Sequence, residues 1–269
     1  MLLLLLLAGA TAVGADTPSP AWPTTLEAHY ALRYNGIEVG RFYVKSTVDD
    51  KAYAMSGSGE VSALFGLVKS SGGSTVAGAI VGGAPSPATY ALEWHPKNKD
   101  GTVLMRFANR VATEIAVVPP PKIKPDIVPL TPAHRVGVLD PVSALMMLTK
   151  ADGRPPCDRR VGIFDGTQRY DIVLSFKRVT PLPPPKPGGQ RALAFVCRAM
   201  YIPVAGHREN SDTKTYAANR DVEVVLARFP GTTVLVPYAV TVPTLWGTGS
   251  ITTKRIEMTT ATGKVTVTE

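Results

Sequence analysis

The sequence is poor in the residues and motifs that build a catalytic or metal centre. Its 269 residues include only two cysteines and four histidines, and no two histidines stand close enough to place two metal ligands on one face of a helix or strand. It also lacks a Gly-x-Ser-x-Gly elbow, a phosphate-binding loop and a dinucleotide fingerprint. We therefore expect a protein that is not an enzyme, with no catalytic residues, no bound metal and no cofactor.

Long apolar runs are scarce as well, and the one that stands out opens the chain. Met1–Leu7 is wholly apolar, and small residues follow it as far as Ala15, which is the form of an export signal and its cleavage site. No Lys or Arg precedes Arg33, so either the true start lies elsewhere or the leader is atypical. We expect residues 1–15 to be a signal peptide and the protein to be periplasmic or otherwise exported. With no second long apolar run, it is not expected to span a membrane.

Acidic residues are outnumbered, with 21 Asp and Glu against 29 Lys and Arg, for a net charge of +8. A positive surface favours anionic neighbours, which outside the cytoplasm are an anionic lipid, a lipoprotein or an envelope polymer. The alternative is that the charge only aids solubility. Nucleic acid is not expected, because the chain lacks an arginine-rich helix and an aromatic-basic motif. The oligomeric state does not follow from the sequence.

The two cysteines, Cys157 and Cys197, predict one disulfide if the protein is exported. Closing the loop between them would stabilise the fold by at most about 4 kcal/mol. The alternative is a reactive thiol at Cys157, whose pKa the neighbouring Arg154, Arg159 and Arg160 would lower.

Strand patterns recur along the chain, each bounded by turn residues. Residues 26–34 alternate apolar and other side chains, Asn35-Gly36 supplies the two positive-φ residues of a type I′ turn, and residues 37–48 return as the second strand of a hairpin. Further runs with strand character cover 53–58, 89–94, 102–107, 161–164, 168–176, 192–202, 221–229, 233–240 and 249–267, the last broken at Gly263.

One short helix is expected at roughly residues 141–150. Asp140 is a favourable N-cap and Pro141 suits the first helical position. Val142, Leu145, Met146 and Thr149 would form its buried stripe. A weaker helical turn is expected at residues 61–65.

These patterns predict an all-β fold, with residues 16–269 forming a single β-rich domain. A sheet of a dozen or more antiparallel strands must curl, so we expect a large curved sheet, barrel-like or a β-spiral, with the helix plugging or flanking its concave side. The proline-rich segments 119–132 and 181–187 are expected to run over the surface as loops, outside the strand ladders.

A few residues are candidates for a site. Asp165-Gly166 is a turn motif between two strands. Tyr238 and Trp246, next to chain reversals, and Leu145 and Met146, on the helix, either fill the core or face a ligand in the concave sheet.

Residues 201–207 form either a loop at a cavity mouth or an ordinary strand exit. A third hypothesis is a cell-wall hydrolase, for which His207 in this segment, together with Asp165 and Asp171, is the candidate trio.

An ordered set of motifs resembles the bacterial envelope proteins grouped as domain of unknown function 3108. The motifs are 34–40, 140–145, Cys157, 164–171, Cys197, 201–207 and 236–238. The resemblance implies an exported β-rich protein with no assigned reaction. By looser analogy of fold, such curved sheets are similar to lipoprotein carriers and envelope-integrity proteins.

The leading hypothesis is a non-enzymatic envelope protein that binds a lipid or lipoprotein-like apolar ligand in the concave sheet and supports envelope integrity. The alternative is a scaffold that acts by protein–protein contacts.

Overall fold

The computed structural model describes residues 22–63, 68–96, 100–122, 124–150, 155–184, 192–229, 234–260 and 263–268. The expected signal peptide lies outside these ranges. The strands are β1 (Thr25–Tyr34), β2 (Ile37–Val48), β3 (Ala52–Ala63), β4 (Val68–Val81), β5 (Ala84–Pro96), β6 (Gly101–Ala108), β7 (Val111–Val118), β8 (Arg159–Phe164), β9 (Arg169–Pro181), β10 (Leu193–Ala205), β11 (Glu223–Arg228), β12 (Leu235–Thr244), β13 (Gly247–Thr260) and β14 (Gly263–Thr268). The helices are α1 (Pro141–Thr149), α2 (Ser211–Ala218) and the 3₁₀ helix η2 (Pro132–Arg135).

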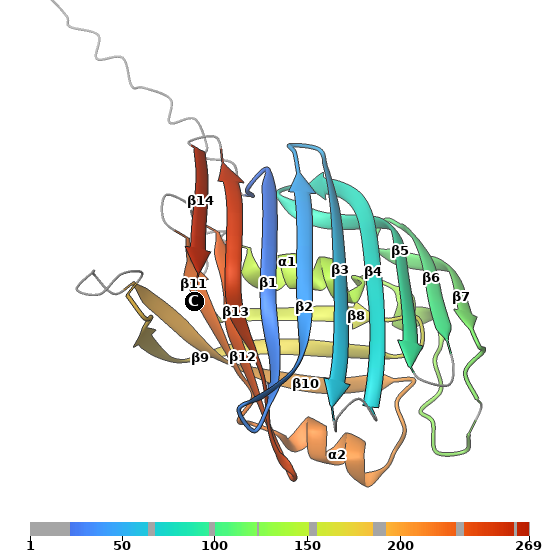
Figure 1. Cartoon of the computed structure of the whole chain (residues 1–269). Helices are drawn as coiled ribbons and strands as arrows, with labels where there is room; N and C mark the ends of the chain where they lie inside the picture. The colour runs from blue at the N-terminus through green and yellow to red at the C-terminus, as the bar shows by residue number, and fades with distance from the viewer. Residues whose placement is uncertain are drawn as a thin grey trace, which may run out of the picture.

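All the strands belong to one 14-stranded sheet, in the order β7-β6-β5-β4-β3-β2-β1-β13-β12-β11-β10-β9-β8, with β14 also paired to β13. Figure 1 shows β13, β1, β2, β3 and β4 side by side as one wall, with β8, β9 and β10 running across behind them. The chain just before α1 bridges the two ends of the sheet, because Val136 pairs with Val111 of β7 and Leu139 pairs with Ile163 of β8. The predicted curved antiparallel sheet is confirmed, nearly closed into a barrel.

The strongest hairpin of the sequence forms for the expected reason. Asn35 and Gly36 adopt φ of 49° and 82°, which lets β1 turn directly into β2. The next reversal is stabilised by Asp49, whose Oδ1 accepts hydrogen bonds from the backbone N–H of Lys51 and Ala52 at 2.8 and 2.7 Å. These turns set the register of β1, β2 and β3.

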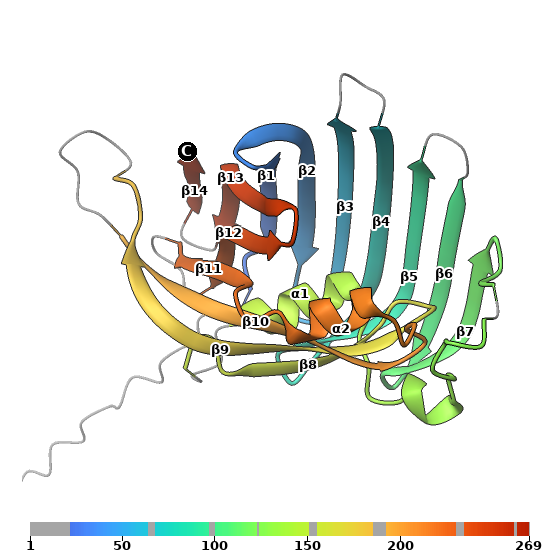
Figure 2. The ribbon, with the colours of Figure 1, turned by 90° about the horizontal axis from the view of Figure 1, so that it is seen from below.

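Helix α1 lies inside the curve of the sheet, between the wall of β1–β6 and the strands β8–β10 (Figure 2). Asp140 caps it, since its Oδ1 accepts hydrogen bonds from the backbone N–H of Val142 and Ser143, both at 2.9 Å. The predicted helix is therefore confirmed. Its expected buried stripe is only partly so, because Met146 and Thr149 are buried whereas Val142 and Leu145 are half-buried.

Several expectations about individual segments were wrong. The strands β4 and β7 and the helix α2 had not been predicted, so the described residues form two α-helices where one was expected. Residues 61–63 continue β3 where a helical turn was expected, and residues 64 and 65 lie outside the described ranges. Pro181 ends β9 opposite Leu193, although it was assigned to a surface loop, because a proline is tolerated at the end of a strand.

The predicted disulfide between Cys157 and Cys197 is present, with the two Cα atoms 5.2 Å apart. It ties the chain before β8 to β10, and both cysteines are buried in a small apolar cluster with residues of β9, β11 and β12. Leu148 of α1 packs against this cluster. A reactive free thiol at Cys157 is thereby excluded.

Candidate functional site

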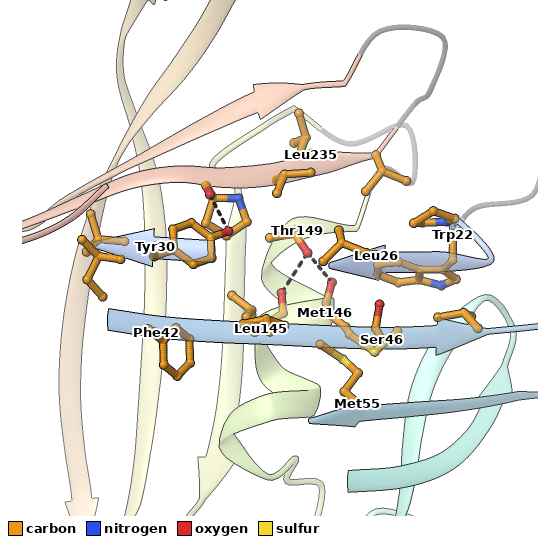
Figure 3. Close-up of a pocket in the computed structure, with 18 of the residues that line it drawn as sticks. Trp22, Leu26, Tyr30, Phe42, Ser46, Met55, Leu145, Met146, Thr149 and Leu235 are labelled. Atoms are coloured by element: carbon orange, nitrogen blue, oxygen red, sulfur yellow. Dashed lines mark hydrogen bonds between the residues drawn. The ribbon is translucent and has the colours of Figure 1, made fainter. Parts of the chain in front are cut away.

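An apolar pocket of about 150 Å³ lies between α1 and the inner faces of β1, β2 and β12 (Figure 3). Helix α1 contributes Leu145, Met146 and Thr149, and the sheet contributes side chains that include Leu26 and Phe42. No Asp, Glu, Lys, Arg or His is among the described residues that line it. The pocket therefore suits an uncharged, apolar group.

One face of β2 lines the pocket over much of its length. Phe42, Val44, Ser46 and Val48 all line it from β2, as alternate residues on one face of the strand. The six residue steps from Phe42 to Val48 span about 20 Å of strand, so the lining follows β2 over that length.

The polar atoms of the pocket are mostly engaged within the protein. The Tyr30 hydroxyl donates a hydrogen bond to the backbone carbonyl of Pro237 at 2.9 Å, and burial raises the pKa of Tyr30 so that it stays neutral. The Thr149 hydroxyl donates to the carbonyls of Leu145 and Met146 at 2.9 and 3.2 Å. These bonds leave the middle of the pocket apolar.

The indole nitrogen of Trp22 differs from these hydroxyl groups, because it has no partner among the described residues. This Nε1 atom is buried. Figure 3 places Trp22 at the same end of the pocket as Ser46, away from Tyr30 and Phe42. Sequence reasoning did not identify Trp22 as a site residue, because only the tertiary fold brings it beside β2.

A buried cluster of hydrogen-bonded side chains at the start of α1 holds the helix in place beside the pocket. The Ser143 hydroxyl donates to Oδ2 of Asp140 and lies 2.6 Å from the Tyr53 hydroxyl on β3. Asp140, Ser143 and Tyr53 are all buried, and burial raises the pKa of Asp140. The helix is therefore fixed against the sheet, and the pocket is formed before any ligand arrives.

The structure separates the four residues that were candidates for contact with a ligand. Leu145 and Met146 line the pocket. Tyr238 does not, although its neighbours Pro237 and Ala239 do. Trp246 is 85% exposed at the turn between β12 and β13, so it neither fills the core nor faces the pocket, because that turn projects away from the sheet interior.

Asp165 and Gly166, the expected turn motif, lie between β8 and β9. Asp165 Oδ1 accepts hydrogen bonds from the backbone N–H of Thr167 and Gln168 at 2.8 and 2.7 Å, and Gly166 has φ of 99°. These bonds close the turn between β8 and β9. The Asp165 carboxylate is therefore occupied with its own turn.

The trio Asp165, Asp171 and His207 does not form an acid–base relay. Asp171 is bound by Arg160 at 2.6 Å and by Arg169, and His207 follows the end of β10 as an ordinary strand exit. Among the residues the structure covers, no hydrogen bond joins any two of the three side chains, and His207 Nδ1 is buried without a partner. The part of the chain that the structure describes holds no cluster of three or more His, Cys, Asp or Glu side chains suited to a metal ion.

A search for membrane-spanning helices in the described part of the chain finds none long and apolar enough. No curated protein and no solved structure matches this sequence. A family model does match, over residues 29–254, which is most of the chain and includes the walls of the pocket from Tyr30 to Ile251. The chain belongs to the family described as protein of unknown function DUF3108.

Proposed function

We propose that this protein is exported to the cell envelope and binds one acyl chain, without catalysing a reaction, in the pocket between α1 and β2. The observation that carries the proposal is the pocket itself, whose described lining is apolar and uncharged and follows β2 from Phe42 to Val48. A protein that only needed a packed core would fill such a space, because interiors otherwise contain few voids larger than a water molecule.

The volume limits what can enter. A cavity of about 150 Å³ holds an apolar group of roughly the size of benzene. A whole two-chain lipid is too large for it, so we propose that the end of a single chain enters while the rest of the molecule stays outside.

The disulfide and the charge support the cellular setting of the proposal. Disulfides persist in oxidising compartments, as expected for an exported protein. The net charge of +8 favours approach to the anionic headgroups and polymers of an envelope.

Lipid-binding measurements on purified protein test the proposal. We expect native mass spectrometry of protein purified from the envelope to show one bound acylated molecule, and acyl methyl esters to raise the melting temperature. Ala239→Leu, which adds three carbon atoms to the pocket wall, should abolish both effects. The matched control is Ala54→Leu on the exposed face of β3. If wild-type protein carries no acyl chain and no ester changes its melting temperature, the proposal is wrong.

A second candidate is a scaffold that acts through protein contacts. It is favoured by exposed apolar residues at two adjacent turns: Leu245 and Trp246 are 80% and 85% exposed, and Ile37 is 70% exposed. The two turns are joined by a hydrogen bond from Asn35 N–H to the Thr248 carbonyl at 2.9 Å. Photocrosslinking from position 246 in cells should then trap one protein repeatedly, and a lack of any reproducible product would exclude this role.

A further inference from the structure

We propose that two adjacent hairpin tips, residues 34–37 between β1 and β2 and residues 244–247 between β12 and β13, insert into the surface of a lipid bilayer, and that the acyl chain enters the pocket from there. This inference rests on the proposed function and deepens it, because it names a bilayer as the source of the chain. It is carried by an apolar strip that joins the pocket to the two tips.

The lining of the pocket becomes more exposed towards the tips. On β2, Val48 and Val44 are buried, whereas Phe42, which lies closer to the tip, is half-buried. The same change occurs along β12, where Leu235 is buried and Val240 is half-buried. The exposed lining at this end gives a ligand a way in from the side of the tips.

An apolar strip continues from this end of the pocket to the tips. Residues paired directly in antiparallel strands have side chains on the same face of the sheet. Ile251 of β13 lines the pocket and is paired with Leu32 of β1 and with Val240 of β12. The next residues on that face are Tyr34 of β1 and Val242 of β12. The strip consists of side chains that are half-buried or exposed: Leu32, Tyr34, Ile37, Val240, Val242 and Ile251.

The strip ends at the three large apolar side chains that are most exposed among the described residues: Ile37 at 70%, Leu245 at 80% and Trp246 at 85%. Both tips lie at the lower end of the sheet in Figure 1. They are held together by Asn35, which donates its N–H to the Thr248 carbonyl at 2.9 Å and accepts the Thr248 N–H at Oδ1 at 2.8 Å. Tryptophan favours the boundary between lipid and water, so this end of the molecule suits a membrane surface.

The tips can enter a bilayer without burying an unpaired charge. Residues 229–253, which include all of β12 and its tip, contain no Asp, Glu, Lys, Arg or His. Next to the other tip, Arg33 Nη2 lies 3.8 Å from Glu38 Oε2, so the two charges offset each other. Insertion would therefore be driven by apolar surface and would not require anionic headgroups.

A bilayer fits the tips better than a protein partner does. Stable protein interfaces bury about 800 Å² on each partner, and the tips offer three apolar side chains at the ends of two turns. Interfacial segments need only sink about 5–10 Å into the headgroup region. A bilayer also supplies acyl chains at the place where the apolar strip begins.

Binding to vesicles of phosphatidylcholine tests the inference. We expect wild-type protein to float with the vesicles at both low and high salt. Replacing Leu245 and Trp246 together by serine should weaken this binding at least about tenfold, because two large side chains no longer leave water. The matched control is Leu104→Ser on β6, where Leu104 is 55% exposed, and it should bind like wild-type protein.

Fluorescence shows directly which surface meets the lipid. The chain has three tryptophans, and Trp246 is the exposed one at a tip. Lipids brominated on their acyl chains near the headgroup should quench the emission of vesicle-bound wild-type protein. Trp246→Phe should still bind the vesicles and should lose most of this quenching. Equal quenching of the two proteins would show that another surface meets the bilayer, which would overturn the inference.

Failure of the inference and failure of the proposed function give different results. If acyl esters raise the melting temperature but wild-type protein does not bind vesicles, or the serine variant binds them equally well, the pocket takes acyl chains and the membrane inference is wrong. Absence of vesicle binding would leave the tips to the protein contacts of a scaffold. If the tips bind vesicles but no ester affects the melting temperature, the proposed function is wrong, and entry of the chain from the bilayer with it.

Discussion

The two ends of α1 have different surroundings inside the same sheet: one is packed and hydrogen-bonded, and the other borders the pocket. The N-terminal end is filled: Asp140, Ser143 and Tyr53 are buried and hydrogen-bonded to one another or to the helix backbone. The C-terminal half borders open space at Leu145 and Met146 on one side. The pocket is therefore not the result of a loosely held helix, because the same helix is fixed by a buried polar network one turn away.

The C-terminal half of α1 has a different kind of support. Leu148 packs against the cluster around the disulfide of Cys157 and Cys197. A covalent link thus supports the helix at this end, together with a hydrogen bond that Nη2 of Arg159 on β8 donates to the carbonyl of Lys150, the C-cap of α1, at 2.6 Å. If this comparison is right, the two supports can be removed separately and should have different consequences for the pocket.

The largest expected effect is loss of the disulfide. Replacing Cys157 and Cys197 together by alanine should lower the free energy of unfolding by up to about 4 kcal/mol, because the unfolded chain regains the freedom of the closed loop. Urea denaturation followed by circular dichroism measures it. Acyl-chain binding should weaken in the same variant, since the cluster behind Leu148 is loosened. A change below about 1 kcal/mol would show that the link adds little.

The next effect comes from the N-terminal end of α1. Asp140→Ala removes the helix cap and leaves buried polar groups without a partner, so we expect a loss of about 3 kcal/mol in the free energy of unfolding. The control is Asn210→Ala, which removes the cap of α2, a helix without buried residues, and should cost about 1 kcal/mol or less. Equal losses in the two variants would contradict the difference drawn between buried and exposed caps.

A smaller effect is the pH dependence of stability that comes from an exposed ion pair between β9 and β11. Hydrogen bonds from Arg178 and then Lys177 of β9 lower the pKa of Glu223 on β11 to about 2. The folded pKa lies below the unfolded value of 4.5, so the stabilisation is present above pH 4.5 and is lost as the pH falls towards 2. We expect Glu223→Gln to cost about 1 kcal/mol at pH 7, given the screening of surface pairs, and nothing near pH 2.

The contribution of Asp140 to stability should change with pH in the direction opposite to that of Glu223, because the first carboxyl is buried and the second lies near the surface. Burial raises its pKa, so the ionised form penalises the folded state at neutral pH and protonation relieves that penalty as the pH falls. The stability of wild-type protein relative to Asp140→Asn should therefore increase as the pH is lowered from 7 towards 4. A difference that stays constant with pH would show that Asp140 does not titrate in this range.

The smallest effect on stability is expected in the pocket. Ala239→Leu should change the free energy of unfolding by less than about 1 kcal/mol, since it fills existing space, while weakening acyl-chain binding more than tenfold. Thermal melts and titration with an acyl methyl ester measure the two quantities. Destabilisation by several kcal/mol would mean that the space is not available to an added side chain.

The elements that could be predicted are those whose signal is local. Asn35-Gly36 dictates its own turn, and Asp140-Pro141 marks the start of a helix whatever surrounds it. The strand β4 was missed because its centre, residues 70–74, consists of Ser and Gly, which carry no strand preference and are held only by β3 and β5. The helix α2 was missed because it has no apolar face, and no residue in it is buried.

The site was predictable only in part for the same reason. Leu145 and Met146 followed from the helix pattern, because the concave side was the natural place for that helix. Trp22 could not be found, since it reaches the pocket only through the pairing of β1 with the far end of β2, where Ser46 and Val48 lie more than twenty positions away in the sequence. The exposure of Trp246 was equally hidden, because a turn next to the core and a turn pointing outward have the same local sequence signal.

A crystal structure with a bromine-labelled acyl ester tests the central claim most directly, because the anomalous signal locates the end of the chain. We predict a single peak inside the pocket, beside Val44, Leu145 and Met146. A pocket that stays empty while the peak lies on the outer surface, for example at Leu245 and Trp246, would contradict the account.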